Sequence, residues 1–110
     1  MQVNHTEATF QIILHGGNAR SLAMEAIALA KDKDMPGARE VLRRAGEELA
    51  KAHQHQTALI QAEVAGEDVG LSMLLVHAQD HLMNAMTTRE LANEFVELYE
   101  RIHESEEAGA

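Results

Sequence analysis

From Leu71 to Ile102 the chain reads LSMLLVHAQDHLMNAMTTRELANEFVELYERI, a run without glycine or proline. Its apolar residues recur at intervals of three and four, which is the period of an α-helix with one side turned toward a core. The pattern predicts a helix that begins near Gly70 and continues to about Glu104. Beyond it we expect a frayed tail from Ser105 to Ala110.

Two segments that precede this helix repeat their apolar residues at the same spacing. The first runs from about Thr6 to Lys31, with Asn4 or Thr6 as its N-terminal cap, and ends before a proline suited to the first turn of a following helix. The second extends roughly from Met35 to Ala65. Glycines at both ends of the segment 66–70 then indicate a turn.

No segment alternates apolar and polar residues with the period of two that a half-buried strand requires. Three helices of roughly 25 to 35 residues joined by short turns predict an all-α fold, an antiparallel up-down-up three-helix bundle. With 110 residues, 45% of them apolar, the chain fits one domain spanning residues 1–110. A core this thin leaves apolar surface on the third helix uncovered, so we expect the chain to associate through that helix.

The charge and composition exclude several classes of function. Eighteen acidic residues against nine basic ones give a formal charge of −9, which repels nucleic acid and anionic membrane surfaces. There is no cysteine, no signal-peptide pattern and no apolar run long enough to span a membrane. We therefore expect a cytoplasmic protein, with no nucleic-acid partner and no membrane insertion, whose reactive groups are histidines and carboxylates.

On a helix, His77, Asp80, His81 and Asn84 share one polar edge beside an apolar side. Two functional interpretations follow from the residue types. His77 and His81, at positions i and i+4, can share a metal ion such as zinc, or one histidine can act as a nucleophile beside a carboxylate and a second imidazole. The alternative is a solvated helix face. Strongly apolar flanking residues predict that the edge is partly buried.

On the second predicted helix, His53 and Gln56 lie three residues apart, near the end of the bundle that should also hold His77. They can donate hydrogen bonds to an anion, or they can simply be polar positions at the edge of a bundle. His5 and His15 have no such context, and we interpret both as incidental.

Glu100 and His103 match the Glu-x-x-His element of di-iron bundles, which need two such elements. This chain has one copy, so we expect a surface pair. Gly16 and Gly17 lie inside the first helix, where each glycine costs about 1 kcal/mol relative to alanine. A phosphate-binding loop would need a preceding strand and a Lys-Ser/Thr pair. The glycines therefore predict close approach by another backbone or by a large side chain.

These residues resemble an enzyme IIA of the lactose/cellobiose/chitobiose type from the bacterial sugar phosphotransferase system. The resemblance covers nearly the whole chain, and its third motif is the most specific. Its motifs are Gly17-Asn18-Ala19-Arg20-Ser21 in the first predicted helix, Ala52-His53 with Gln56-Thr57 in the second, and His77-Ala78-Gln79-Asp80-His81-Leu82-Met83 in the third.

The resemblance implies a homotrimer of three-helix bundles and a phosphoryl carrier, a phosphotransferase component that works through a transient phosphohistidine. By this comparison His77 accepts a phosphoryl group from the phosphocarrier protein HPr and passes it to a cognate enzyme IIB for coupled sugar uptake. Asp80 matches an aspartate that meets its two symmetry mates around a divalent cation, Mg²⁺, between subunits. The candidates for binding the phosphoryl group are His53, Gln56, Gln79 and His81.

A different class of function uses the same fold. The chain can instead be a trimeric structural or regulatory interaction domain without relay activity. Substitution of His77 distinguishes the two, because only a carrier loses its activity with that side chain.

Overall fold

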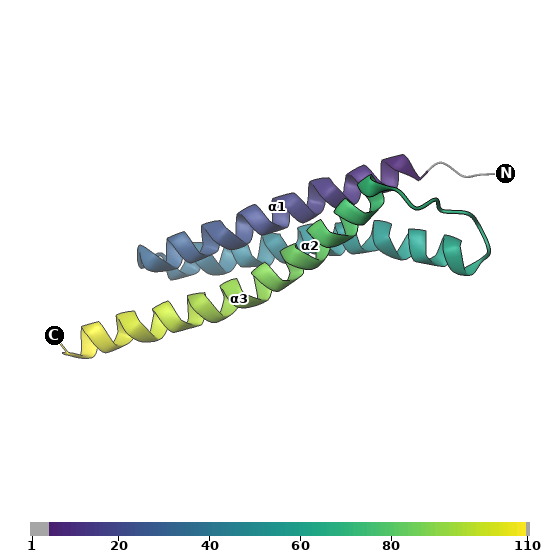
Figure 1. The fold of residues 1–110 in the computed structure, drawn as a ribbon. Coiled ribbons are helices and arrows are strands. Elements are labelled where there is room, and N and C mark those ends of the chain that lie inside the picture. Colours follow the sequence, from purple (N-terminus) through teal and green to yellow (C-terminus); the bar gives the residue numbers. More distant parts are fainter. Residues whose placement is uncertain (1–4, 110) are drawn as a thin grey trace.

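The computed structural model describes residues 5–109, and three helices contain most of them. They are α1 (Thr6–Lys31), α2 (Met35–Val64) and α3 (Met73–Gly109), and they run up, down and up along a rod of 69 × 20 × 19 Å. α1 packs against both other helices, whereas α2 and α3 contact each other less. Figure 1 shows the starts of α1 and α3 at one end of the rod and the end of α3 at the other. The predicted all-α, up-down-up bundle is confirmed.

A side-chain cap marks the start of α2 but not that of α1. α1 has the predicted bounds, but its N-terminal cap is His5, not Thr6, and Asn4 lies outside the described residues. At the start of α2 the Asp34 carboxylate accepts the N–H of Gly37 at 3.0 Å, which supplies a partner for one of the unpaired donors at a helix start.

The connection between α2 and α3 is longer than the sequence pattern predicts. α3 begins at Met73 and not near Gly70, because Gly70 has φ +76° and its N–H donates to the Asp68 side chain at 3.0 Å. The Ser72 hydroxyl then accepts the N–H of Leu75 at 3.1 Å and caps the new helix. These hydrogen bonds place residues 70–72 in the connection, whereas the apolar period alone would assign them to the helix.

The prediction of a frayed tail after Glu104 was wrong, because α3 continues to Gly109. Glu106 in this last part lies 3.7 Å from both the Lys33 ammonium and the Nδ1 atom of His103. One turn earlier, His103 Nε2 donates to the carbonyl of Ala30 at 2.7 Å, which satisfies an acceptor at the end of α1. These contacts tie the C-terminal turns of α3 to the turn between α1 and α2.

The core consists of two aliphatic clusters rich in alanine. Ile12 and Leu82 are the largest fully buried side chains, and both belong to the cluster nearer the start of α1. The other cluster lies toward the end of α1 and is built around Val41, Leu42 and Val96. Alanine side chains at most of the remaining buried positions let the helix backbones approach one another closely.

Arg89 lies on α3 between the residues of these two clusters. Its Nε donates to the carbonyl of Leu42 on α2 at 3.1 Å, and a Cβ at Gly46 would lie only 2.8 Å from one of its terminal nitrogens. Gly46 therefore provides the space that the guanidinium occupies beside α2. Together with the Arg39–Glu100 ion pair, this hydrogen bond links two helices that otherwise touch little.

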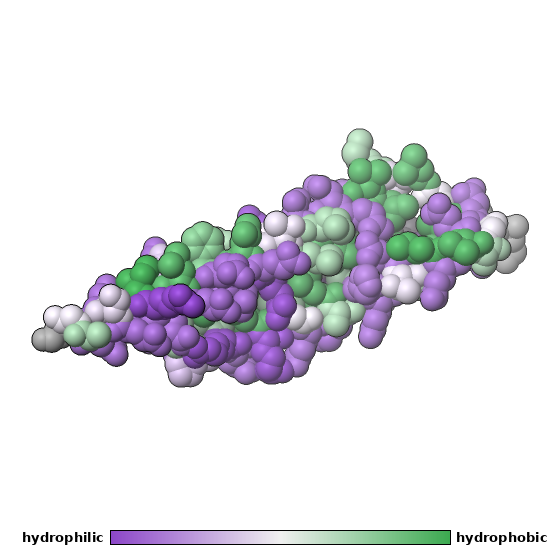
Figure 2. All heavy atoms as spheres, turned by 90° about the horizontal axis from the view of Figure 1, so that it is seen from below, coloured by the Kyte–Doolittle hydropathy of each residue, from purple (hydrophilic) through white to green (hydrophobic). Residues whose placement is uncertain are grey.

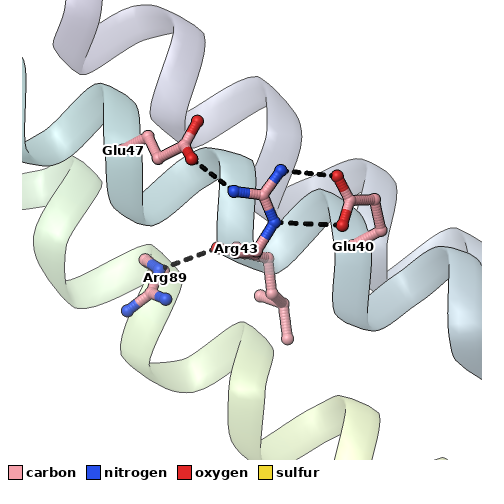
Figure 3. A network of polar contacts seen from close by, with 5 residues as sticks. Glu40, Arg43, Glu47 and Arg89 are labelled. Carbon is pink, nitrogen blue, oxygen red and sulfur yellow. Dashed lines mark hydrogen bonds and ion pairs between the residues drawn. The ribbon is translucent and has the colours of Figure 1, made fainter.

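A network of charged side chains lies on the surface of α2, close to the contact between Arg89 and Leu42. Figure 3 shows Arg43 between Glu40 and Glu47, with Arg89 approaching the α2 backbone from α3. The hydrogen bonds from Arg43 lower the pKa of the Glu40 carboxyl group below its ordinary value, and the pKa of Arg43 is raised correspondingly. Because these groups are exposed, water screens the pairs and they add little to stability.

Large apolar side chains remain exposed along α3. Figure 2 shows the apolar surface as patches that extend along the rod. At 100° per residue, many of these side chains lie on one side of the helix, a surface that we call the α3 stripe. Its members are Met73, Val76, Met83, Leu91, Phe95, Leu98 and Ile102, each at least 40% exposed.

Leu82→Ala should lower the free energy of unfolding by about 2–5 kcal/mol, because Leu82 is fully buried and its loss leaves a cavity between α1 and α3. Urea denaturation followed by circular dichroism measures the change. Val64→Ala is the control, since Val64 is 83% exposed and its truncation should change stability by less than about 0.5 kcal/mol. Equal losses in the two variants would contradict the assigned core.

Candidate functional site

His77 lies in the second turn of α3 with its side chain exposed. His81 follows one helical turn later, and the two imidazole rings stack with their centroids 5.8 Å apart and their planes 22° from parallel. The predicted pairing of these two histidines is therefore confirmed. In stacked rings the nitrogen lone pairs lie in two nearly parallel planes and do not converge on one point, which is a poor arrangement for binding one metal ion.

His81 lies against the backbone of α1 at the paired glycines. A Cβ at Gly16 would lie 3.4 Å from His81 Cδ2, and a Cβ at Gly17 would lie 3.1 Å from His81 Nε2. The same Gly16 Cβ would lie 3.7 Å from the Cα of Leu82. Both predicted reasons for the glycines are confirmed, since a large side chain and a neighbouring backbone approach α1 here.

A second pair of candidates joins α2 to α3. Gln56 Nε2 donates to Gln79 Oε1 at 2.6 Å, so the two amides lie together although they are 23 residues apart in the chain. His53 lies one turn before Gln56 on α2, is exposed, and makes no hydrogen bond or ion pair within residues 5–109. The structure thus brings four candidates together in two pairs and leaves His53 apart.

Burial along the polar edge differs from the prediction. His81 is half-buried, but His77, Asp80 and Asn84 are exposed in the single chain. The expectation of a partly buried edge therefore holds for His81 alone. Asp80 makes no hydrogen bond or ion pair with any described residue, and at 100° per residue it falls within the α3 stripe between Val76 and Met83.

The interpretation of His15 as incidental was wrong. Its Nδ1 donates to Glu48 at 2.5 Å, its Nε2 lies 3.1 Å from the side-chain amide of Gln11, and its ring stacks on His55 with centroids 6.4 Å apart. These contacts hold α1 against α2 directly beside Gly16. The sequence offered one signal, because His15 directly precedes the two glycines that predict a close helix contact. Its partner Glu48, however, lies 33 residues away in the chain.

His5 and the Glu-x-x-His element have structural contacts as well. His5 Nε2 lies 3.9 Å from a Glu67 oxygen, at the end of the rod that holds His77. Glu100 pairs with Arg39 while His103 binds the carbonyl of Ala30. The expected surface pair between Glu100 and His103 was therefore wrong, because each side chain serves a different contact between helices.

Two further findings limit what the described part of the chain can do. Within residues 5–109, no group of three or more histidine, cysteine, aspartate or glutamate side chains is placed to hold a metal ion. Over the same residues, no helix has the length and hydropathy that a membrane crossing requires. Metal binding by one chain through His77 and His81 thus lacks a third ligand.

Residues 7–100 match the family model described as "PTS system, Lactose/Cellobiose specific IIA subunit". The chain belongs to this family, whose members are phosphotransferase components that act through a phosphohistidine. The resemblance found in the sequence motifs is thereby confirmed.

Individual relatives agree with the family assignment. The chain is 62% identical over 95 residues to the lichenan-specific phosphotransferase enzyme IIA component of Bacillus subtilis, a match that covers 86% of each chain. The crystal structure of the cellobiose-specific enzyme IIA from Bacillus anthracis aligns with a TM-score of 0.89 at 50% identity over 94% of each chain. The IIA component in the IIA(Chitobiose)–HPr complex of Escherichia coli aligns with a TM-score of 0.77 at 37% identity, covering 92% of this chain and 98% of that one.

Proposed function

We propose that His77 accepts a phosphoryl group from phosphorylated HPr and donates it to a cognate enzyme IIB during coupled sugar uptake. The observation that carries the proposal is an exposed imidazole in the most specific motif of the family, with a second imidazole stacked 5.8 Å away. The solved complex of a related IIA with HPr supports HPr as the donor. Because HPr meets this site from solution, we also propose that the protein works in the cytoplasm.

The chemistry suits histidine. A neutral imidazole near pH 7 has a nitrogen lone pair that can attack phosphorus in line. The new bond from His77 to phosphorus forms as the donor's phosphorus–nitrogen bond breaks, and the departing imidazole keeps the electron pair and takes up a proton. Because one phosphohistidine replaces another, positioning of the groups contributes more than any elaborate catalytic apparatus.

Polar side chains on α2 and α3 can supply hydrogen-bond donors, and Gln79, two residues after His77, projects from another side of α3 than His77 does. Gln56 uses one amide hydrogen in its bond to Gln79, so its second hydrogen and both hydrogens of Gln79 remain for an anion. His81 and His53 can add ring N–H donors. We propose that these four side chains balance the charge of the bound phosphoryl group.

His77→Ala should abolish phosphorylation, because it removes the nucleophile. The chain is incubated with enzyme I, HPr and phosphoenolpyruvate, and its intact mass is measured at neutral or alkaline pH because phosphohistidine is acid-labile. Wild type should gain one phosphoryl group per chain. The matched control is His55→Ala, whose ring stacks on His15 on another side of α2 and which should be phosphorylated normally.

Two outcomes would contradict this assignment. Phosphorylation that persists in His77→Ala would place the acceptor at another histidine. Failure of wild type to gain mass, with HPr shown to be phosphorylated, would favour the alternative of a trimeric interaction domain without relay activity.

We further propose that the chain assembles as a homotrimer through the α3 stripe. The stripe presents large apolar side chains over the length of a helix that the other two helices cover on one side only. Exposed apolar surface of this extent is typical of an interface between proteins. On α1, Phe10, Leu14 and Met24 are each half-exposed and extend the apolar surface beyond α3.

Asp80 gives this interface an acidic position between Val76 and Met83. In a trimer about an axis along α3, three Asp80 carboxylates would approach one another and would need protonation or a cation. Carboxylate oxygens are suitable ligands for Mg²⁺, and Asp80 has no competing partner within the described residues. We propose that Asp80 from each of three copies holds a divalent cation, Mg²⁺, that stabilises the assembly while His77 stays outside the coordination sphere.

Asp80→Asn should remove the dependence of the assembly on Mg²⁺, because an amide has neither the charge nor the affinity of a carboxylate. Native mass and thermal melting are measured with Mg²⁺ and with a chelator. Wild type should melt higher and remain trimeric with the metal, whereas Asp80→Asn should not respond to it. Glu104→Gln, an exposed acid elsewhere on α3, should behave as wild type. Identical responses of wild type and Asp80→Asn would refute the site.

We infer that the coupled permease transports a saccharide of the lichenan or cellobiose kind. The support is the identity of 62% to a lichenan-specific and 50% to a cellobiose-specific IIA component, against 48% to a galactose-specific and 40% to a chitobiose-specific one. The phosphorylated chain should therefore transfer its phosphoryl group faster to the IIB of a lichenan system than to that of a chitobiose system. Equal rates in a competition assay would remove this inference.

A further inference from the structure

The paired glycines of α1 have no conformational reason to be glycine. Among the glycines of the described residues, positive φ angles occur at Gly66 and Gly70 and not at Gly16 or Gly17, which lie in regular helix. Each costs about 1 kcal/mol relative to alanine in a helix. What they provide is space, and the side chain that uses this space is His81.

His81 lies between the α1 backbone and His77. One edge of its ring, from Cδ2 to Nε2, covers Gly16 and Gly17, and its face stacks on the ring of His77. A methyl group at Gly17 would stand 3.1 Å from Nε2, which is closer than comfortable van der Waals contact. Either α1 or the imidazole would then have to move.

The surroundings indicate that the imidazole would move. α1 is anchored at this level by His15, which donates to Glu48, and by the buried Gly16, which packs against the backbone of α3 at Leu82. The His81 side chain, in contrast, is half-exposed and has open space on its solvent side. A Cβ at Gly17 therefore displaces the ring by a few tenths of an ångström and leaves the helix in place.

We propose that Gly17 is a positioning residue for phosphoryl transfer. Because Gly17 has no side chain, the His81 ring can lie against α1. The position of the His81 ring in turn fixes the position of the His77 ring and of the hydrogen-bond donor that faces the phosphoryl group. This inference rests on the proposed function of His77. Gly17 has no side chain that could contact HPr or the phosphoryl group, so it acts on the transfer through His81.

Gly17→Ala should separate stability from activity. The variant gains helix propensity, so its melting temperature should equal or exceed that of wild type. Its kcat/KM for phosphoryl transfer from HPr should fall about tenfold, because small misplacement of positioning groups is expensive for transfer reactions. Gly46→Ala is the control for the same change at another close contact: its Cβ displaces the Arg89 guanidinium and its bond to Leu42, about two turns beyond His81 on α3, so stability should fall while transfer stays at the wild-type rate.

A double-mutant cycle tests the route through His81. His81→Ala alone should slow transfer, and adding Gly17→Ala to it should slow transfer no further, because the displaced ring is gone. If Gly17→Ala lowers the rate by the same factor in both backgrounds, Gly17 acts independently of His81 and the proposal is wrong. The native mass of each variant is measured as well. Loss of assembly in Gly17→Ala would also overturn the proposal, in favour of a role for Gly17 in subunit packing.

A measurement without phosphoryl transfer keeps this proposal separate from the proposed function. Imidazole NMR signals of His77 and His81 are recorded at one pH in unphosphorylated wild type, Gly17→Ala and Gly46→Ala. Gly17→Ala should shift the His81 signals, and Gly46→Ala should not. If the signals shift but the chain accepts no phosphoryl group, Gly17 positions His81 and the proposed function of His77 is wrong. If the signals do not shift, Gly17 does not position His81 and the present proposal is wrong.

Discussion

Close packing of helices through very small side chains governs this structure. The buried positions of α1 include Gly16, Ala19, Ala23, Ala26 and Ala30, and α3 contributes further alanines at the same contact. Small side chains let two backbones approach, but they bury little apolar area per residue, so the bundle has a thin core. The larger apolar side chains are left on the outer side of α3. The same feature therefore explains both the fit of the helices and the need for another surface to cover them.

The site follows from this close approach. Where α1 and α3 come together at the glycine pair, a side chain on α3 as large as histidine can lie directly over backbone. His81 takes that place, and His77, one turn earlier, is free to face solvent. The opposite side of α1 is held to α2 by the hydrogen bond from His15 to Glu48. Packing on both sides of one helix thus supports a histidine that is itself exposed, as the phosphoryl exchange proposed for His77 requires.

The sequence pattern predicts the parts of this molecule that depend on neighbouring residues. The bounds of α1 and the shared edge of His77, Asp80 and His81 follow from helical period alone, and the need for space at Gly17 follows from the cost of glycine. The start of α3 was missed because the preceding turn is held by a hydrogen bond from the Gly70 N–H to the Asp68 carboxylate, which the apolar period does not reveal. Its end was missed because two of the contacts that hold it, with Lys33 and with the carbonyl of Ala30, involve residues far earlier in the chain.

Contacts between helices were harder to predict than positions on one helix. The hydrogen bond between Gln56 and Gln79 depends on the register of α2 against α3, which local patterns do not encode. The same holds for Arg89, which reaches the carbonyl of Leu42 only because Gly46 leaves room.

The length of α3 places the His77 end of the molecule far from the other end. His77 lies near the start of this helix, and at 1.5 Å per residue the helix end at Gly109 is about 50 Å away. A fluorophore, affinity tag or fused domain joined beyond Gly109 would therefore stand clear of any protein that docks at His77. One joined ahead of α1 would lie at the docking end, so the choice of attachment point decides whether such a probe reports on phosphoryl exchange or obstructs it.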